Sequence, residues 1–296
     1  YLTMKFSRIP KQGRVYEEFK LYHLNCEFGS IRELCQDLLE YAKYYTNIVF
    51  KRNSDTDLRR LYEDIIDLRM EVSYPFLLKI HHDCTEGLIT SDELKEILEL
   101  CISYVLRRAV CEIPTNSMNK TFATLKNYIK PDDYLNSVKA FFVMQDTYKE
   151  FPDNDKFEGA FVNRDIYNMR ARNYILSRLE NFENKAPITI ENYTIEHIMP
   201  QTLSDDWKSD LGADANRIHE TYVHTIGNLT LTGYNSEYQN KRFSDKVDCT
   251  DKAGNAIGYR HTPIKLSSYL TTVSKWGEDE ILARAEMLSD ELITIW

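Results

Sequence analysis

The sequence lacks several features that would place it in particular classes of protein. It has no window of 18 apolar residues, and it does not open with a basic segment that leads into an apolar run, so we expect neither a membrane-spanning helix nor a secretory signal from these residues. Its six cysteines include no CxxC pair, so a zinc site built on paired CxxC motifs is also excluded. We therefore expect a cytoplasmic protein in which reduced cysteines are buried as small hydrophobic residues.

The chain also lacks an excess of positive charge. It has 37 Lys and Arg against 46 Asp and Glu, a net charge of −9, so phosphate contacts would need local basic clusters. Such clusters are Arg107-Arg108, the arginines at positions 164 to 178, and Lys241-Arg242. Each cluster taken alone is interpreted either as a solvated helix face or as a phosphate-binding patch.

The residues that are present indicate a globular protein. A chain of 296 residues with 43% apolar and 12% aromatic residues can bury the core of one large domain or two ordinary ones. The sequence opens in YLTMKF without an initiator Met. We therefore expect it to be a piece of a longer polypeptide.

From Ser30 to about Phe182 the apolar residues recur at helical spacing. Ser30 with Glu33, and Thr90 with Glu93, are predicted capping boxes that open helices. Further helices are predicted over residues 56–70, 117–129, 131–149 and 163–183. We expect these helices to form a bundle without internal repeats.

One histidine pair, His81-His82, lies in this helical part. Neighbouring residues on a helix point about 100° apart, so the two rings make a poor metal pair. We expect ordinary packing, and no metal site, from them.

After residue 185 the apolar period changes from 3.6 to about 2. The β-branched segments ITIENYTIEHI and IGNLTLTG predict two strands, and Asn235, an N-cap type of residue, predicts a helix over SEYQNKRFSDK. A closing helix is predicted from the apolar face formed by Ile281, Ala285, Leu288, Leu292 and Trp296. The expected fold class is mainly α with a small α+β part, in which an N-terminal helical bundle is followed by a ββα domain.

The pair Glu196-His197 ends the first predicted strand, and Pro200 stops it. A neutral His near pH 7 can remove a proton from water, and a carboxylate is a hard ligand for Mg²⁺ or Mn²⁺. Successive strand residues point to opposite faces, so both side chains can face one site only where the strand ends or twists. Asn228 and Asn240 would bring amide groups from the second strand and the following helix, and such a site could hydrolyse a phosphodiester.

These segments resemble a known family. IEHIMPQ and HTIGNLTLTGYNSEYQNKRFSDK, together with Trp207 and Trp276, are similar to the DUF1524 family, the HNH-type (His-Me finger) nuclease domain of GmrSD-like modification-dependent restriction proteins. Upstream, YLTMKFSRIPKQGRVYEEFKLY and SYVLRRAVCEIPTNSMNKTFATL are similar to the tail of the DUF262 region and the helical linker of the same proteins. The resemblance implies a helical domain over 1–185, a ββα nuclease domain over 186–296, and a DUF262 nucleotide-binding region that precedes this sequence.

The resemblance also implies roles for single residues. His197 matches the general base, Glu196 the acidic metal ligand and Asn228 the middle asparagine. The last ligand matches either Asn240 or Asn235 of the family's N-x4-N pattern. We prefer Asn240, because Asn235 has the competing role of capping the helix.

Further residues are assigned to nucleic-acid binding. Lys246, in FSDK, matches a lysine that the family keeps and is expected near phosphate, together with Lys241 and Arg242. His224, four residues before Asn228, would either touch the site or only pack beside it. The expected cofactor is a divalent metal, Mg²⁺ or Mn²⁺.

Three hypotheses on function follow. The leading one is a metal-dependent DNA endonuclease, the effector part of a type IV restriction or phage-defence protein that acts on modified phage DNA. An alternative is a non-catalytic nucleic-acid-binding or regulatory module that retains the ββα fold. In the third, the helical half is a spacer and a homodimer surface.

Overall fold

The computed structural model describes residues 1–25 and 28–296. The chain divides into two compact units, which we call the helical unit (Tyr1–Pro152 with Trp296) and the ribbon unit (Asp153–Ile295). The described residues are mainly helical, with a single two-stranded sheet, as the fold class predicted. The boundary at 185/186 was drawn from family resemblance and stays a prediction.

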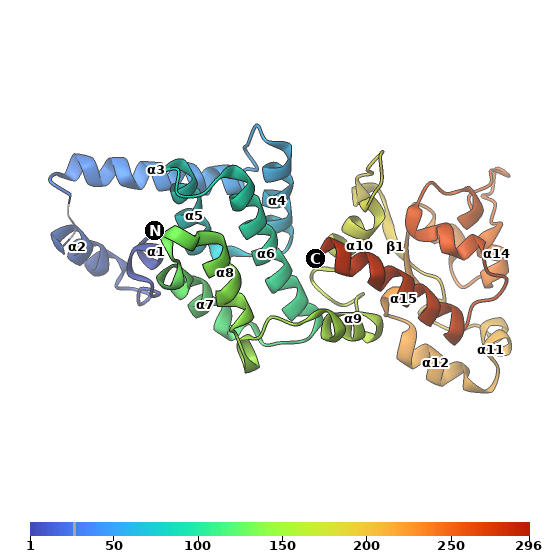
Figure 1. The fold of residues 1–296 in the computed structure, drawn as a ribbon. Coiled ribbons are helices and arrows are strands. Elements are labelled where there is room, and N and C mark those ends of the chain that lie inside the picture. The colour runs from blue at the N-terminus through green and yellow to red at the C-terminus, as the bar shows by residue number, and fades with distance from the viewer. Residues whose placement is uncertain (26–27) are drawn as a thin grey trace. The chain divides into compact units, whose positions relative to one another are not determined.

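The helical unit is built from α-helices that pack around α5, which contacts α1, α3, α6 and α7 (Figure 1). Its helices are α1 (Leu2–Phe6), α2 (Val15–Asn25), α3 (Ile31–Val49), α4 (Thr56–Asp67), α5 (Tyr74–Thr85), α6 (Ser91–Val110), α7 (Met118–Leu125) and α8 (Tyr134–Val143). The sequence prediction omitted α5, whose first turn contains Pro75. Proline is tolerated there because the first helical N–H groups have no partner within the helix.

The predicted capping boxes are present to different degrees. Thr90 Oγ1 accepts a hydrogen bond from Glu93 N (3.2 Å), and the Glu93 carboxylate accepts one from Thr90 N (2.8 Å), so the box that opens α6 is complete. Ser30 accepts from Glu33 N (3.3 Å), but the Glu33 carboxylate accepts from Gly29 N instead. Only half of the second box is therefore formed.

One predicted basic cluster is buried. Arg107 is 8% exposed and Arg108 is 1% exposed, so the interpretation of this pair as a solvated helix face, or as a phosphate patch, is wrong. Arg108 Nη2 donates to the carbonyl oxygens of Pro114 (2.7 Å) and Tyr148 (3.0 Å). The guanidinium therefore satisfies backbone carbonyl groups in two short connections, at the start of one 3-10 turn and within another.

The cysteines also differ from the prediction. Cys101 and Cys249 are buried, as expected, but Cys35 is exposed, and Cys84 and Cys111 are half-buried. Cys26 lies outside the described residues.

The ribbon unit contains the two-stranded sheet and seven α-helices, all within the described residues. They are α9 (Asn154–Asn163), α10 (Arg172–Asn181), β1 (Thr194–His197), α11 (Asp205–Leu211), α12 (Ala215–Tyr222), β2 (Leu229–Thr232), α13 (Asn235–Tyr238), α14 (Phe243–Val247) and α15 (Glu278–Ile295). β1 and β2 pair antiparallel, with His197 opposite Leu229. Both strands lie where the alternating segments predicted them.

Two predicted helices are interrupted. The range 163–183 contains α10, but residues 164–171 are not α-helical, and α9 has already ended at Asn163. The helix expected from Asn235 onwards is split into α13 and α14, because Gln239 has a positive φ of 44°. The third part of the expected ββα unit is thus two short helices joined by a turn.

The core of the ribbon unit lies between the sheet, the loop after β1 and α15. It contains, among others, Ile198, Met199, Trp207, Phe243, Trp276 and Ile281. α15 passes so close to the turn before β2 that a Cβ on Gly227 would lie 2.2 Å from the carbonyl oxygen of Ile281. Only glycine allows that approach. No helix in the described part of the chain is long and apolar enough to cross a membrane.

Candidate active site

The antiparallel ribbon places Glu196 and His197 on opposite faces of β1. Glu196 pairs with Thr230 and His197 with Leu229, and both side chains are buried, at 3% and 6% exposure. The Glu196 carboxylate bonds to Lys246 of α14, whereas the His197 ring bonds to His224, which precedes β2. The alternation of strand side chains therefore persists to the end of β1.

Asn228 fixes the chain immediately after His197. Its Oδ1 accepts hydrogen bonds from Met199 N (2.8 Å) and Trp276 Nε1 (3.1 Å), and its Nδ2 donates to Met199 O (2.9 Å) and Val223 O (2.9 Å). The amide is fully buried, and both its donors and its acceptor are in use. We call this arrangement the Asn228 bracket. It holds backbone and leaves no amide group free for substrate or metal.

His197 lies in a cluster of polar rings. Its Nε2 is 3.1 Å from His224 Nδ1, and its Nδ1 is 3.3 Å from Gln201 Nε2. The ring of Tyr167 meets it edge-on at 4.4 Å between centroids and stacks on His224 at 5.1 Å. Burial, followed by the neighbouring His224 and Lys246, lowers the pKa of His197 to about 3, while Asp165 acts in the opposite direction. The imidazole is therefore neutral near pH 7.

The segment between α9 and α10 completes this cluster. Ile166 N and Tyr167 N both donate to the carbonyl oxygen of His224, at 3.0 and 3.2 Å, and Arg172 donates to Tyr167 O (2.8 Å). The sequence prediction made this segment part of a helix and so missed Asp165 and Tyr167 as site residues. No local signal marks them, because their contacts with His197 and His224 cross about 30 to 60 residues of sequence. Gln201, in the motif IEHIMPQ, was also not assigned a role.

Lys246 is an interior residue. Its Nζ is 2.6 Å from Glu196 Oε1 and also donates to His197 O (2.9 Å) and Ile198 O (3.0 Å), so all three ammonium hydrogens have acceptors. The side chain has no exposed surface. The prediction that Lys246 contacts phosphate is therefore wrong. The side chain instead stabilises the end of β1 from the interior.

The Glu196–Lys246 pair has a large cost of burial. Removal from water raises the pKa of Glu196 and lowers the pKa of Lys246, and the attraction between the two charges opposes both shifts. Tyr259, which is fully buried beside Glu196, has its pKa raised by the same loss of solvent. Removal of only one partner from such a pair strongly destabilises the protein, because it leaves an unpaired charge in the interior.

The two asparagines proposed as the last ligand lie at the surface. Asn235 does not cap α13, whose N-cap residue is Tyr234; its amide instead donates to Thr194 Oγ1 (3.1 Å) and Ile195 O (3.0 Å). Asn235 therefore has no capping role that would favour Asn240 over it as a ligand. Asn240 is exposed in the turn between α13 and α14.

Lys241 and Arg242 follow Asn240. Lys241 is exposed, with its Nζ 3.2 Å from Cys249 Sγ. Arg242 is half-buried and forms an ion pair with Asp210 at 2.9 Å. Of the three basic residues assigned to nucleic acid, these two remain accessible to a phosphate.

The predicted metal ligands do not fit one cation. The carboxylate of Glu196 is bonded to Lys246 on the face of β1 opposite to the His197 ring, and the Asn235 amide bonds to the edge of β1. Among the described residues, the one group of three or more His, Cys, Asp or Glu side chains close enough to share an ion lies in the helical unit. The donor set of the ribbon unit is therefore different from the one that the motif implied.

Residues 151–291 match the family model for the C-terminal domain of GmrSD restriction endonucleases. The match covers the ribbon unit almost completely, including the ribbon, the Asn228 bracket and α14. A comparison with curated proteins finds none that matches. This part of the chain is thus similar to a restriction-endonuclease domain, which supports a nuclease-related function.

Proposed function

We propose that the ribbon unit is an HNH-type DNA endonuclease that hydrolyses phosphodiester bonds. The observation that carries the proposal is the position of His197: a neutral imidazole at the end of β1, held in place by the Asn228 bracket and bonded to a second histidine. The similarity of residues 151–291 to the C-terminal domain of GmrSD restriction endonucleases supports the same reaction class.

The hydrogen bonds suggest which atom acts as the base. One proton arrangement satisfies all three side chains: His197 Nε2–H donates to His224 Nδ1, and the Gln201 amide donates to His197 Nδ1. Gln201 is exposed, so a water molecule can replace its amide without a change in the ribbon. His197 Nδ1 would then take a proton from that water, while His224 accepts the bond from Nε2–H and orients the ring.

The neighbouring charges tune this step. A ring with a pKa of about 3 is a weak base until negative charge approaches it. A phosphodiester bound beside the ring supplies that charge, and Asp165 acts in the same direction. The base would thus become stronger when the substrate binds.

The resemblance also leads us to propose a divalent cation, Mg²⁺ or Mn²⁺. Because Glu196 is bonded to Lys246, and Asn235 to β1, the residues first assigned as ligands do not form its site. We assign no step of the reaction to the cation. The cleavage assay, run with different cations, tests whether the reaction requires one.

The proposed substrate is DNA, modified phage DNA in the setting of a GmrSD-like type IV restriction or phage-defence protein. Lys241 and Arg242 are the proposed phosphate contacts, next to the exposed Asn240. Sensing of the DNA modification is assigned to the DUF262 nucleotide-binding region that the resemblance implies. That region would be a partner of the ribbon unit within a longer protein.

The test compares plasmid cleavage by the protein and its His197→Ala variant in Mg²⁺, Mn²⁺ or Ni²⁺, on unmodified and phage-modified DNA. Loss of a positioned base costs 10²- to 10⁴-fold in typical enzymes, so we expect a decrease of at least about 100-fold. His261→Ala, an exposed histidine of the same unit, is the matched control and should cleave normally. Equal cleavage by the protein and His197→Ala would remove His197 from the mechanism.

A specific observation favours the alternative of a non-catalytic nucleic-acid-binding module. His197 is only 6% exposed, and the carboxylate beside it in sequence is engaged by Lys246. This alternative predicts duplex binding that weakens steeply with salt, no cleavage with any cation, and no effect of His197→Ala on affinity.

We also propose that the helical unit can form a homodimer surface. Large apolar side chains are exposed along α2 and α3, among them Tyr16 (70%), Leu24 (75%) and Ile31 (67%). Sedimentation at several concentrations should then give a mass that rises with concentration. A strictly monomeric chain would count against this role.

A further inference from the structure

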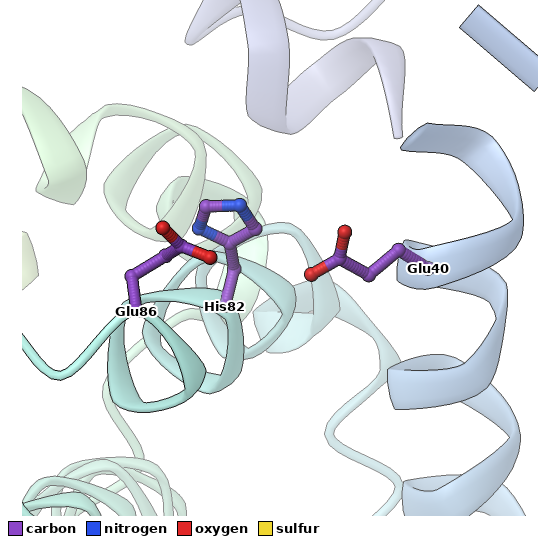
Figure 2. Close-up of side chains that lie close together, drawn as sticks. All are labelled: Glu40, His82 and Glu86. Carbon is purple, nitrogen blue, oxygen red and sulfur yellow. The ribbon is translucent and has the colours of Figure 1, made fainter. Parts of the chain in front are cut away.

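We propose that the helical unit contains a divalent-cation site formed by Glu40, His82 and Glu86. Each residue offers one ligand atom, and these atoms lie within 4.8 Å of one another. Figure 2 shows the three side chains converging: Glu40 from α3, His82 from α5, and Glu86, the residue that follows α5. From the sequence we expected no metal pair made by His81 and His82. The site uses His82 without His81 and adds two carboxylates.

The helices bring these residues together for simple geometric reasons. His82 and Glu86 are four residues apart and therefore share one face of the last turn of α5. α3 packs along α5, which brings Glu40 to the same point. The site would thus join two helices that are separated by α4 in the sequence.

Side chains from α3 hold two of the ligands in place. The ring of Tyr41 stacks on His82 at 5.2 Å with an interplanar angle of 10°. The hydroxyl of Tyr44 donates to Glu40 Oε1 at 2.6 Å, which leaves the second carboxylate oxygen for an ion. Supporting contacts of this kind orient the ligands of protein metal sites.

The hydrogen bonds of the two neighbouring histidines differ in a way that points to a ligand. His81 bonds through both nitrogens, to Tyr62 Oη and Leu77 O at 2.7 Å each. His82 Nδ1 is buried without a hydrogen-bond partner, and Asp83 Oδ1 lies 3.7 Å from it, too far for a hydrogen bond. A buried polar atom without a partner is unfavourable, and a metal ion would satisfy the imidazole.

The charges around the site are also unbalanced. Asp83 pairs with Lys79, but within residues 1–25 and 28–296 neither Glu40 nor Glu86 forms an ion pair with a lysine or arginine. Two carboxylates that converge without a basic partner repel each other. A cation between them would convert this repulsion into attraction.

The ligand set indicates the type of ion. One imidazole and two carboxylates suit a first-row transition ion such as Mn²⁺ or Zn²⁺ better than Ca²⁺ or Mg²⁺, which prefer oxygen ligands only. Metal–ligand distances of about 2.1 Å place ligand atoms roughly 3 to 4 Å apart, so small side-chain rotations would close the site. The bound ion would fasten α3 to α5.

The test uses Mn²⁺, because it competes poorly for the free cysteines. The metal-free chain, kept in reductant, is titrated while the signal of free Mn²⁺ is followed by electron paramagnetic resonance. We expect binding that His82→Gln and Glu86→Gln each weaken at least tenfold. His261→Gln and Glu183→Gln, two exposed positions of the ribbon unit, are the matched controls and should bind normally.

Two further measurements keep the result unambiguous. Mn²⁺ should raise the unfolding midpoint of the unmodified protein by a few degrees and have a smaller effect on Glu86→Gln, whose exposed side chain is not needed for folding. His197→Ala should retain the binding, which separates this site from any cation used in DNA cleavage. Undiminished binding by His82→Gln and Glu86→Gln, or no binding by the unmodified protein at millimolar Mn²⁺, would overturn the proposal.

Discussion

The two units each bury a histidine, and the two histidines are held in different ways. In the helical unit, His81 bonds to a hydroxyl and a backbone carbonyl, and burial lowers its pKa to about 4. In the ribbon unit, His197 bonds to a second titratable ring and to the amide of an exposed glutamine. Both rings are neutral near pH 7, but only His197 has a partner that solvent can replace.

The partners of each ring distinguish a structural histidine from a candidate catalytic one. The partners of His81 fix its ring from both sides and lie in the interior, which is what a structural histidine requires. The support of His197 comes instead from backbone: the Asn228 bracket and Lys246 hold residues 197 to 199, and the ring itself remains tied to the surface through Gln201. A low pKa alone would not have distinguished the two.

The largest effect should follow from breaking the buried ion pair. Lys246→Met leaves Glu196 without its cation in the interior, and we expect a loss of about 3 to 5 kcal/mol in the free energy of unfolding of the ribbon unit. The comparable pair in the helical unit is Lys79–Asp83, but Lys79 is partly exposed and Asp83 is also bonded by Tyr134. Lys79→Met should therefore cost about 1 kcal/mol or less. Urea unfolding of both variants measures the difference, and equal losses would contradict this account of Lys246.

A smaller loss is expected from changing the Asn228 bracket. Asn228→Asp removes the two N–H donors to Met199 O and Val223 O, and we expect a loss of about 2 to 4 kcal/mol. Asn240→Asp, at an exposed position of the same unit, is the matched control and should change stability by less than about 0.5 kcal/mol. Thermal unfolding of the two variants tests the bracket. If Asn228→Asp were as stable as the control, the bracket would not hold the site.

The pH dependence of stability should reflect both histidines. Each has a folded-state pKa below its unfolded value of about 6.5, so the unfolded chain binds more protons as the pH falls below 6.5, and the folded state loses stability. The loss should approach about 1.4 kcal/mol per pH unit per histidine, and should continue until the pH reaches the folded pKa, about 4 for His81 and about 3 for His197. Urea unfolding between pH 7 and 5 measures it.

Substitutions assign this slope to the two units. His81→Gln should flatten it for the helical unit and His197→Gln for the ribbon unit, whereas the exposed His261→Gln should leave both slopes unchanged. A ribbon unit whose slope survived His197→Gln would show that another group titrates there.

The smallest effect on stability is expected at the surface. Arg242 and Asp210 form an ion pair that solvent reaches from both sides, with side-chain exposures of 40% and 41%, and Arg242→Ala should cost less than about 1 kcal/mol. If Arg242 contacts a phosphate, the same change should lower the slope of log affinity for DNA against log salt by about 1. An unchanged salt slope would remove Arg242 from the DNA interface.

Part of this structure could be predicted from local sequence. The capping box of α6 depends on Thr90 and Glu93 alone, and the two strands follow from β-branched segments, so both were found. His197 ends β1, as the motif predicted, whereas Asn228, which was expected on the second strand, lies in the turn immediately before β2.

The rest depended on contacts between distant residues. Tyr167 reaches His197 because residues 164–171 leave the helical path and bond to His224 O, which no local pattern records. Lys246 was predicted to lie at the surface because lysine is rarely buried. Its burial depends on the Glu196 carboxylate, which pairs with it in the interior. Likewise Glu40 and His82 are neighbours only because α3 packs along α5.

The Asn228 bracket has a consequence for the segment that it encloses. One side chain ties Met199 to Val223, so the chain between these points starts and ends at fixed positions whatever path it takes. The exposed turn at Gly212 and Ala213, between α11 and α12, is therefore a place where added residues would cost little and leave the imidazole where it is. A reporter peptide or a new recognition loop could be grafted there.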